Sequence, residues 1–318
     1  MNLKRGEIIR CSPVWKACNI SACEWGRDWS RAPGPSEKER IRQTEAAIRA
    51  DVNTILDAGC GNGWICNTLN GRYRVVGIDY VAEALRYVRA PKVRGDLRRL
   101  PFPEKSFDLV LCCEVLEHLD DSMYETVLSE LIRVARKYIL ITVPNNEDLN
   151  LFYYKCPECG TKFNPFGHLR SFTLGKLRAL FSGPRKGRME CLEAREIGPV
   201  PVRPQNVFLS RFRLEKFGHW SNNPEAVCPN CGCFGNSARL PLALRLYGFA
   251  LRLANAVLNP RKIPRATWLL AVYRLERVKE GPFSRACAGF APSFERASKG
   301  GTKPNGRTSF PAANPPGG

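Results

Sequence analysis

The residues best suited to hold a ligand are an aspartate and three glycines that follow a short apolar run. Asp57 ends the run, and Gly59, Gly61 and Gly63 follow at alternate positions. Glycine permits a backbone φ above zero and lets a ligand approach without a Cβ in the way. Residues 64–69 can then begin a helix, whose free N–H groups favour oxygen acceptors or negative charge. The spacing predicts a strand, a tight turn and a helix that form a binding loop.

A second apolar run, residues 75–78, ends in another carboxylate, Asp79, which lies 22 residues after Asp57. An acid at the tip of the second strand is placed to accept hydrogen bonds from the two hydroxyls of a ribose. Asp96 and Glu114 follow two further predicted strands in the same way. Because ligands bind beyond the carboxyl ends of parallel strands, we expect these side chains to converge on one shared site.

The elements that must position these residues alternate between strand and helix along the chain. Such alternation predicts an α/β fold with a mostly parallel sheet and helices on both faces. The expected strands lie near 53–57, 73–78, 92–95, 107–112, 137–143, 189–197 and 267–275, and the expected helices near 40–50, 62–70, 81–89, 122–135 and 174–181.

Four motifs together resemble the class I S-adenosylmethionine (SAM)-dependent methyltransferases, and most closely the branch that includes ubiquinone-type O-methyltransferases. The motifs are LDAGCGNG (56–63), VVGIDY (75–80), GDLRRLPFPEKSFDLV (95–110) and EVLEHL (114–119), and the resemblance covers roughly residues 45–145. It implies a Rossmann-like core with a mostly parallel seven-stranded sheet. In this family the last strand, here 267–275, is expected to pair antiparallel at the sheet edge.

The resemblance also implies which residues hold the cofactor. Asp57 would meet the amino acid part of SAM, and Asp79 would bind the ribose hydroxyls. Since the sulfonium of SAM is already activated, the enzyme mainly has to hold donor and nucleophile in line. No metal or covalent intermediate is obligatory. Asp96 and Leu97 would hold the adenine, and the full set of expected cofactor-binding residues is Asp57, Gly59, Gly61, Gly63, Asp79, Tyr80, Asp96, Leu97 and Glu114.

The candidate catalytic residues are Glu114, Glu117, His118 and His168. The first three share one face if their turn is helical. The set resembles that of Mg²⁺-assisted family members with two glutamates and two histidines, in which a metal would lower the pKa of a substrate hydroxyl and orient it. Two alternatives stay open. Glu117 and His118 could instead brace the loop after the fourth strand, and His168 could act as a general base.

Two Cys-Pro-x-Cys-Gly turns predict a structural zinc site held by Cys156, Cys159, Cys228 and Cys231. Each turn can aim two thiolates at one tetrahedral ion, and its glycine allows the tight bend. The gap of 68 residues between the turns exceeds that of a standard zinc ribbon, so the intervening helix and strand would have to bring them together. The alternative is two turns without metal.

Charge and composition separate the two halves of this chain of 318 residues. Residues 1–150 hold 22 Lys/Arg against 21 Asp/Glu, whereas residues 151–318 hold 27 against 9. The basic excess attracts phosphates, nucleic acid or anionic lipid headgroups, or is simply a solvated face with a disordered tail. Fourteen cysteines without a signal-peptide core argue against a disulfide framework. With no long uncharged apolar stretch, we expect a cytoplasmic protein without a transmembrane segment.

Four regions are expected along the chain. Residues 1–36 form an N-terminal arm or lid, 37–150 the SAM-binding core, 151–278 the rest of the core with the zinc insertion, and 279–318 a disordered basic tail. The apolar stretch 239–258 carries two arginines on one helical face. It is expected to pack on the sheet, with peripheral membrane contact or an apolar substrate as alternatives.

The expected function is methyl transfer from SAM to an oxygen of a small or lipid-linked metabolite, with nitrogen or carbon acceptors left open. An RNA methyltransferase that uses the basic half is the alternative, although the chain has no recognisable RNA-binding module. A non-catalytic, zinc-bearing binding protein is the third reading. The intact set of Asp57, Gly59, Gly61 and Asp79 argues against it.

Overall fold

The computed structural model describes residues 28–149, 154–156, 158–182, 189–202, 228–232, 242–258 and 263–276. The expected basic tail and most of the expected N-terminal arm lie outside the described residues. The described α-helices are α2 (Pro35–Ala46), α3 (Trp64–Leu69), α4 (Ala82–Leu85), α5 (Asp121–Val134), α6 (Leu174–Arg178) and α8 (Leu242–Leu258), and η2 (Leu116–His118) is a short 3-10 helix. The described strands are β1 (Thr54–Ala58), β2 (Arg74–Asp79), β3 (Lys92–Arg94), β4 (Phe107–Cys113), β5 (Ala135–Pro144), β6 (Tyr154–Lys155), β7 (Lys162–Phe163), β8 (Met189–Val202) and β9 (Ile263–Leu275).

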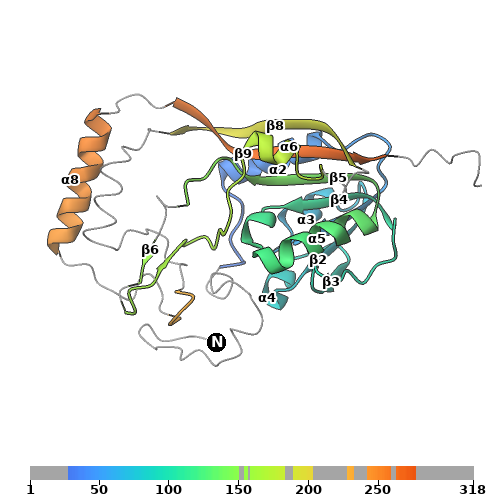
Figure 1. Cartoon of the computed structure of the whole chain (residues 1–318), viewed down its shortest axis with the longest axis horizontal. Helices are drawn as coiled ribbons and strands as arrows, with labels where there is room; N and C mark the ends of the chain where they lie inside the picture. The colour runs from blue at the N-terminus through green and yellow to red at the C-terminus, as the bar shows by residue number, and fades with distance from the viewer. Residues whose placement is uncertain are drawn as a thin grey trace, which may run out of the picture. The chain divides into compact units, whose positions relative to one another are not determined.

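Seven strands form one sheet in the order β3-β2-β1-β4-β5-β9-β8, with helices on both sides (Figure 1). Strands β1 to β5 run parallel, and β9 pairs antiparallel with both β5 and β8. The expected mostly parallel α/β sheet is therefore confirmed. The expectation that the last strand lies at the sheet edge was wrong. The long strand β8 pairs with β9 from Met189↔Leu275 to Val202↔Ile263 and takes the edge position itself.

Local sequence explains where the elements begin and end. Every residue of β4 is buried, as a run that is apolar at every position except Asp108 indicates. Helix α5 begins after Asp120, whose Oδ1 accepts hydrogen bonds from the backbone N–H groups of Ser122 and Met123. The expected helix over 81–89 is reduced to the short α4, since the chain turns away after Leu85.

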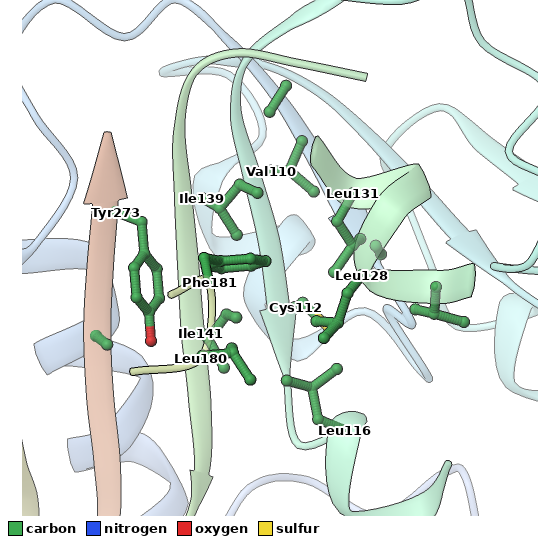
Figure 2. Packing of buried hydrophobic residues seen from close by; sticks show 14 of the residues in the cluster. Val110, Cys112, Leu116, Leu128, Leu131, Ile139, Ile141, Leu180, Phe181 and Tyr273 are labelled. Carbon is green, nitrogen blue, oxygen red and sulfur yellow. The ribbon is translucent and has the colours of Figure 1, made fainter. Parts of the chain in front are cut away.

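Alternate residues of the central strands face two separate apolar layers. From β4, Val110 and Cys112 pack with α5 and α6, whereas Leu109 and Leu111 face the layer that includes α2, α3 and α4. Figure 2 shows the first layer, in which Phe181 meets the ring of Tyr273 edge-on, with 4.7 Å between ring centroids. Both faces of the sheet are thus covered, and the carboxyl ends of β1, β2, β4 and β5 are left to carry a site.

Helix α8 differs from the others because its apolar side chains are exposed. Leu246, Phe249, Leu253 and Val257 recur at helical spacing, and each is more than half exposed. The described part of the chain therefore does not cover this face, although the sequence predicted that the helix packs on the sheet. Among the described helices, none has the length and apolar character needed to span a membrane.

Candidate functional site

The glycine-rich turn after β1 has the conformation that its sequence predicts. Gly59, Gly61 and Gly63 have φ values of +78°, +53° and +82°, all in the left-handed region that favours glycine. The backbone N–H of Gly59 donates to the carbonyl of Ile78 over 2.8 Å, which ties the turn to β2. A Cβ added at Gly59 would lie 2.4 Å from Cγ2 of Val115. A larger residue would push the turn away from the strand ends.

Asp57 is a buried carboxylate at the start of this turn. Only 2% of the residue is exposed, and its Oδ2 has no hydrogen-bond partner among the described residues. Burial, assisted by the nearby Asp79 carboxylate, raises the pKa of Asp57 to about 7 against the opposing effects of Cys66 and Arg40. A cationic group beside Oδ2 would complete this site and favour the ionised carboxylate. The ammonium group of an amino acid has the required chemistry.

Asp79 ends β2 and is held by the backbone on both sides. Its Oδ2 accepts from the N–H of Gly61 over 2.7 Å, and its Oδ1 accepts from the N–H of Val81 over 2.9 Å. A carboxylate offers about four acceptor positions, so it can take further hydrogen bonds from hydroxyls. The neighbouring Tyr80 ring is partly exposed and lies under the guanidinium of Arg94, 5.6 Å from the ring centroid.

The two residues expected at the adenine lie after β3. The Asp96 carboxylate accepts from both the backbone N–H and the guanidinium of Arg98. The Arg98 hydrogen bond keeps the pKa of Asp96 below its ordinary value, so the group stays ionised. Leu97 is partly buried against the apolar core and presents a small apolar surface.

A segment before α2 contacts the glycine-rich turn, and the sequence did not reveal these contacts. The side-chain amide of Asn62 donates to the carbonyl of Trp29 over 2.7 Å, and the indole N–H of Trp64 donates to the carbonyl of Arg31 over 3.2 Å. A Cβ added at Gly61 would lie 3.4 Å from the Trp29 ring. The described part of the expected N-terminal arm therefore lies against the glycine-rich turn, near the site that the arm was expected to cover.

A second group of polar residues gathers near the carboxyl ends of β4 and β5. Glu117, His118 and His168 offer ligand atoms that all lie within 4.8 Å of one another. The rings of the two histidines have centroids 4.9 Å apart. Glu117 is 1% exposed, and neither of its carboxylate oxygens has a hydrogen-bond partner among the described residues. Burial, assisted by the charge of Glu114, raises the pKa of Glu117 well above its ordinary value.

His168 is held by a carboxylate that sequence reasoning missed. Its Nδ1 is hydrogen-bonded to Oε2 of Glu147, which follows the end of β5. The next residue, Leu169, donates its backbone N–H to the carbonyl of Glu117 over 2.7 Å. His118 contacts the same segment, with its Nδ1 3.3 Å from the carbonyl of Gly167. Position alone could have indicated Glu147, since it is another carboxylate just beyond a parallel strand.

Glu114 lies outside this group, so the structure does not bring together the full set of two glutamates and two histidines. Its Oε1 accepts from the hydroxyl of Thr142 over 3.2 Å, and its Oε2 accepts from the indole N–H of Trp268 over 2.7 Å. One carboxylate and two imidazoles remain. Mg²⁺ prefers oxygen ligands, whereas imidazole suits zinc, iron, nickel or copper, so this donor set does not fit the expected Mg²⁺ well.

Comparison of the sequence with known proteins places the glycine-rich turn in a known domain family. Residues 56–139 match the methyltransferase domain family. These residues form a class I SAM-dependent methyltransferase domain. A protein of Mycolicibacterium smegmatis named as a SAM-dependent methyltransferase is 34% identical over 142 residues, which cover 42% of this chain and 52% of the relative. One from Mycobacterium tuberculosis is 31% identical over 151 residues, which cover 45% and 52%.

The chain spans about half the length of the curated relatives that it matches. Among solved structures, a SAM-dependent methyltransferase from Archaeoglobus fulgidus aligns with a TM-score of 0.44 and 16% identity, over 76% of this chain and 95% of that one. The match to the methyltransferase domain ends at residue 139, so Glu147, His168 and the cysteine turns all lie beyond it.

Beyond the methyltransferase domain, the structure brings the four predicted thiols together. Their sulfur atoms all lie within 4.8 Å of one another. The sulfur atoms of Cys156 and Cys231 are 3.4 Å apart, and those of Cys159 and Cys228 are 3.5 Å apart. Cys156 and Cys228 are buried, and Phe163 of β7 packs in the same apolar cluster. Such a thiol cluster has the composition of a structural zinc site.

Proposed function

We propose that this chain transfers the methyl group of SAM to a hydroxyl oxygen of a small or lipid-linked metabolite. The observation that carries the proposal is the arrangement of Asp57, the glycine-rich turn and Asp79 at the ends of two adjacent parallel strands. The second support is the pair of His168 and Glu147, which lies beyond β5 and offers a base for the acceptor.

Binding of the donor uses groups that the fold holds in place. The buried Oδ2 of Asp57 would accept from the ammonium group of the methionine part, and the carboxylate of Asp79 would accept from the ribose hydroxyls. Asp96 and Leu97 would contact the adenine. SAM supplies a methyl group on a positively charged sulfur, which is already a good leaving group. The protein therefore contributes mainly position and orientation.

His168 is the proposed base for the acceptor hydroxyl. When Glu147 accepts a hydrogen bond from Nδ1–H, the other ring nitrogen, Nε2, keeps a lone pair that can accept a proton. The acceptor oxygen forms the new bond to the methyl carbon and gives its proton to Nε2. The carbon–sulfur bond breaks, and its electron pair stays on sulfur. A positioned base of this kind contributes about 10²- to 10⁴-fold to a rate.

A zinc ion is proposed at the four thiols, since tetrahedral sites of four cysteines are typical of structural zinc.

The alternative acceptor is RNA. The second half of the chain has 27 Lys/Arg against only 9 Asp/Glu, a basic excess that would attract its phosphates. No specific contact among the described residues of that half favours RNA, so this function becomes an outcome of the experiment below.

The test is methyl transfer from labelled SAM into a fractionated extract of the source cells, with wild type and His168→Gln compared. The proposal expects label in a small or organic-soluble product, and a rate at least roughly 100-fold lower for His168→Gln with SAM binding retained. Label in a nuclease-sensitive polymer would replace the metabolite with RNA. SAM binding without label in any fraction would leave a binding protein on a methyltransferase fold.

A further inference from the structure

The two cysteine turns have the same local geometry although they lie far apart in the chain. In the first turn the N–H of Gly160 donates to the carbonyl of Cys156 over 3.0 Å, and in the second the N–H of Gly232 donates to the carbonyl of Cys228 over 2.9 Å. The two glycines have φ values of +71° and +72°. Each turn therefore presents its two sulfur atoms in the same way, as a pair of metal-binding knuckles would.

The distances between sulfur atoms fit a shared ion and exclude disulfides. Two of the pairs, at 3.4 and 3.5 Å, are far longer than the S–S bond of about 2.05 Å, and all four thiols are free. Four sulfurs at about 2.3 Å from a tetrahedral zinc would be about 3.8 Å from one another. The observed pairs are close to that separation. The burial of Cys156 and Cys228 and the packing of Phe163 against them give the site an apolar shell.

The first knuckle lies inside the segment that carries the proposed base. Cys156 follows Glu147 by nine residues, and His168 follows Cys159 by nine residues. The knuckle forms the connection of the hairpin β6–β7, in which Tyr154 pairs with Phe163, and His168 follows β7. Whatever fixes this hairpin also restricts the two ends of the segment, where Glu147 and His168 meet.

The second knuckle comes from a distant part of the chain. Cys228 and Cys231 follow β8, which lies at the edge of the sheet. An ion shared by both knuckles would therefore join the Glu147–His168 segment to the chain beyond β8. Backbone hydrogen bonds hold the base of the segment at both of its ends, from Asn146 N–H to the carbonyl of Phe172 and from Leu169 N–H to the carbonyl of Glu117, and the zinc would hold the far side, where the knuckle lies.

We propose that Cys156, Cys159, Cys228 and Cys231 bind one zinc ion that clamps the hairpin and so positions the pair of Glu147 and His168 for proton transfer. The zinc site acts through that pair and does not touch the donor. Loss of zinc should therefore lower the rate of transfer and leave SAM affinity unchanged. The effect on rate rests on the proposed function, whereas the presence of zinc and its effect on His168 do not.

The experiment compares wild type with Cys159→Ser and with the control Cys191→Ser. Cys191 is a partly buried thiol of β8 that lies outside the cluster. Substitution is preferable to a chelator, because a chelator could also remove a metal from Glu117, His118 and His168. For each protein, zinc is measured by elemental analysis after purification under reducing conditions, and SAM affinity by calorimetry. The environment of His168 is followed by NMR of ¹⁵N-labelled histidine, since the chain has three histidines in all.

Wild type and Cys191→Ser should hold about one zinc per chain, and Cys159→Ser should hold far less. In Cys159→Ser the Nδ1 resonance of His168, assigned with His168→Gln, should move toward that of a free imidazole. The SAM dissociation constant should stay within about twofold, while kcat falls at least roughly tenfold. Absence of zinc from reduced wild type would overturn the site. An unchanged His168 signal in zinc-depleted Cys159→Ser would overturn the clamp, whether or not an acceptor has been found.

Discussion

Replacing Asp57 by asparagine should stabilise the unliganded protein at alkaline pH and weaken SAM binding. The side chain is 2% exposed, and burial raises its pKa from 3.8 to about 7. In the unfolded chain the carboxyl loses its proton near pH 3.8, whereas in the folded chain it keeps the proton to about pH 7. Folding therefore takes up a proton between these values. The stability contributed by the protonated form is full below 3.8 and is lost as pH rises through about 7.

The size of the effect follows from the two pKa values. The difference between the two pKa values corresponds to a loss of roughly 4 kcal/mol of unfolding free energy once the carboxylate is ionised in the folded state. Between about pH 5.5 and 8.5 the wild type should lose roughly 2 kcal/mol of unfolding free energy that Asp57→Asn does not lose. Urea unfolding of both proteins at several pH values measures this difference. Glu104→Gln is the matched control, because that carboxylate side chain is 73% exposed.

Binding of SAM should show the opposite dependence on pH. If the ammonium group pairs with ionised Asp57, the dissociation constant of wild type should rise about tenfold for each pH unit below about 7. Asp57→Asn should bind weakly with little dependence on pH in that range, and Glu104→Gln should behave as wild type. Equal pH profiles of stability for wild type and Asp57→Asn, or equal SAM affinity, would refute the reasoning.

Three further substitutions test the turn, the base and the core. Gly59→Ala should abolish SAM binding and lower the unfolding free energy, measured in urea, by about 2–4 kcal/mol, because its Cβ would lie 2.4 Å from Val115. Gly71→Ala is the control, since Gly71 also has a positive φ but nothing lies within 4 Å of the added Cβ, and it should cost only about 1 kcal/mol. Glu147→Gln should lower kcat about 10- to 100-fold in initial-rate assays without changing SAM affinity, because it removes the charge that orients His168. Phe181→Ala should cost about 3–5 kcal/mol in the same urea assay, since this ring is fully buried against the ring of Tyr273, and a cost under about 1 kcal/mol would contradict the packing.

The sequence was sufficient for the parts of the fold that depend on local patterns. The apolar run before Asp57 and the alternate glycines predicted the first strand, the turn and the helix, because left-handed backbone and buried strands leave direct traces in residue type. The cysteine knuckles were equally clear. Their Cys-Pro-x-Cys-Gly spacing indicated one shared cluster even though 68 residues separate them.

Other features depend on contacts that no local pattern records. The edge position of β8 is set by its long pairing with β9, and nothing in residues 267–275 indicates which strand will lie outside. The position of Glu147 just beyond β5 could have indicated it, but its pairing with His168, 21 residues away across the hairpin, could not be read from a local pattern. Glu114 shared the spacing of Glu117 and His118, yet its left-handed backbone and its bonds to Thr142 and Trp268 turn it away from them.

The most direct test of the central claim is calorimetric titration of SAM into the purified protein and into Asp79→Ala. SAM is expected to bind at the ends of β1 and β2, with its ribose hydroxyls on the Asp79 carboxylate. Wild type should bind one SAM per chain, and Asp79→Ala should bind at least roughly tenfold more weakly, which corresponds to about 1.4 kcal/mol. No binding by folded wild type, or an unchanged dissociation constant in Asp79→Ala, would contradict the account.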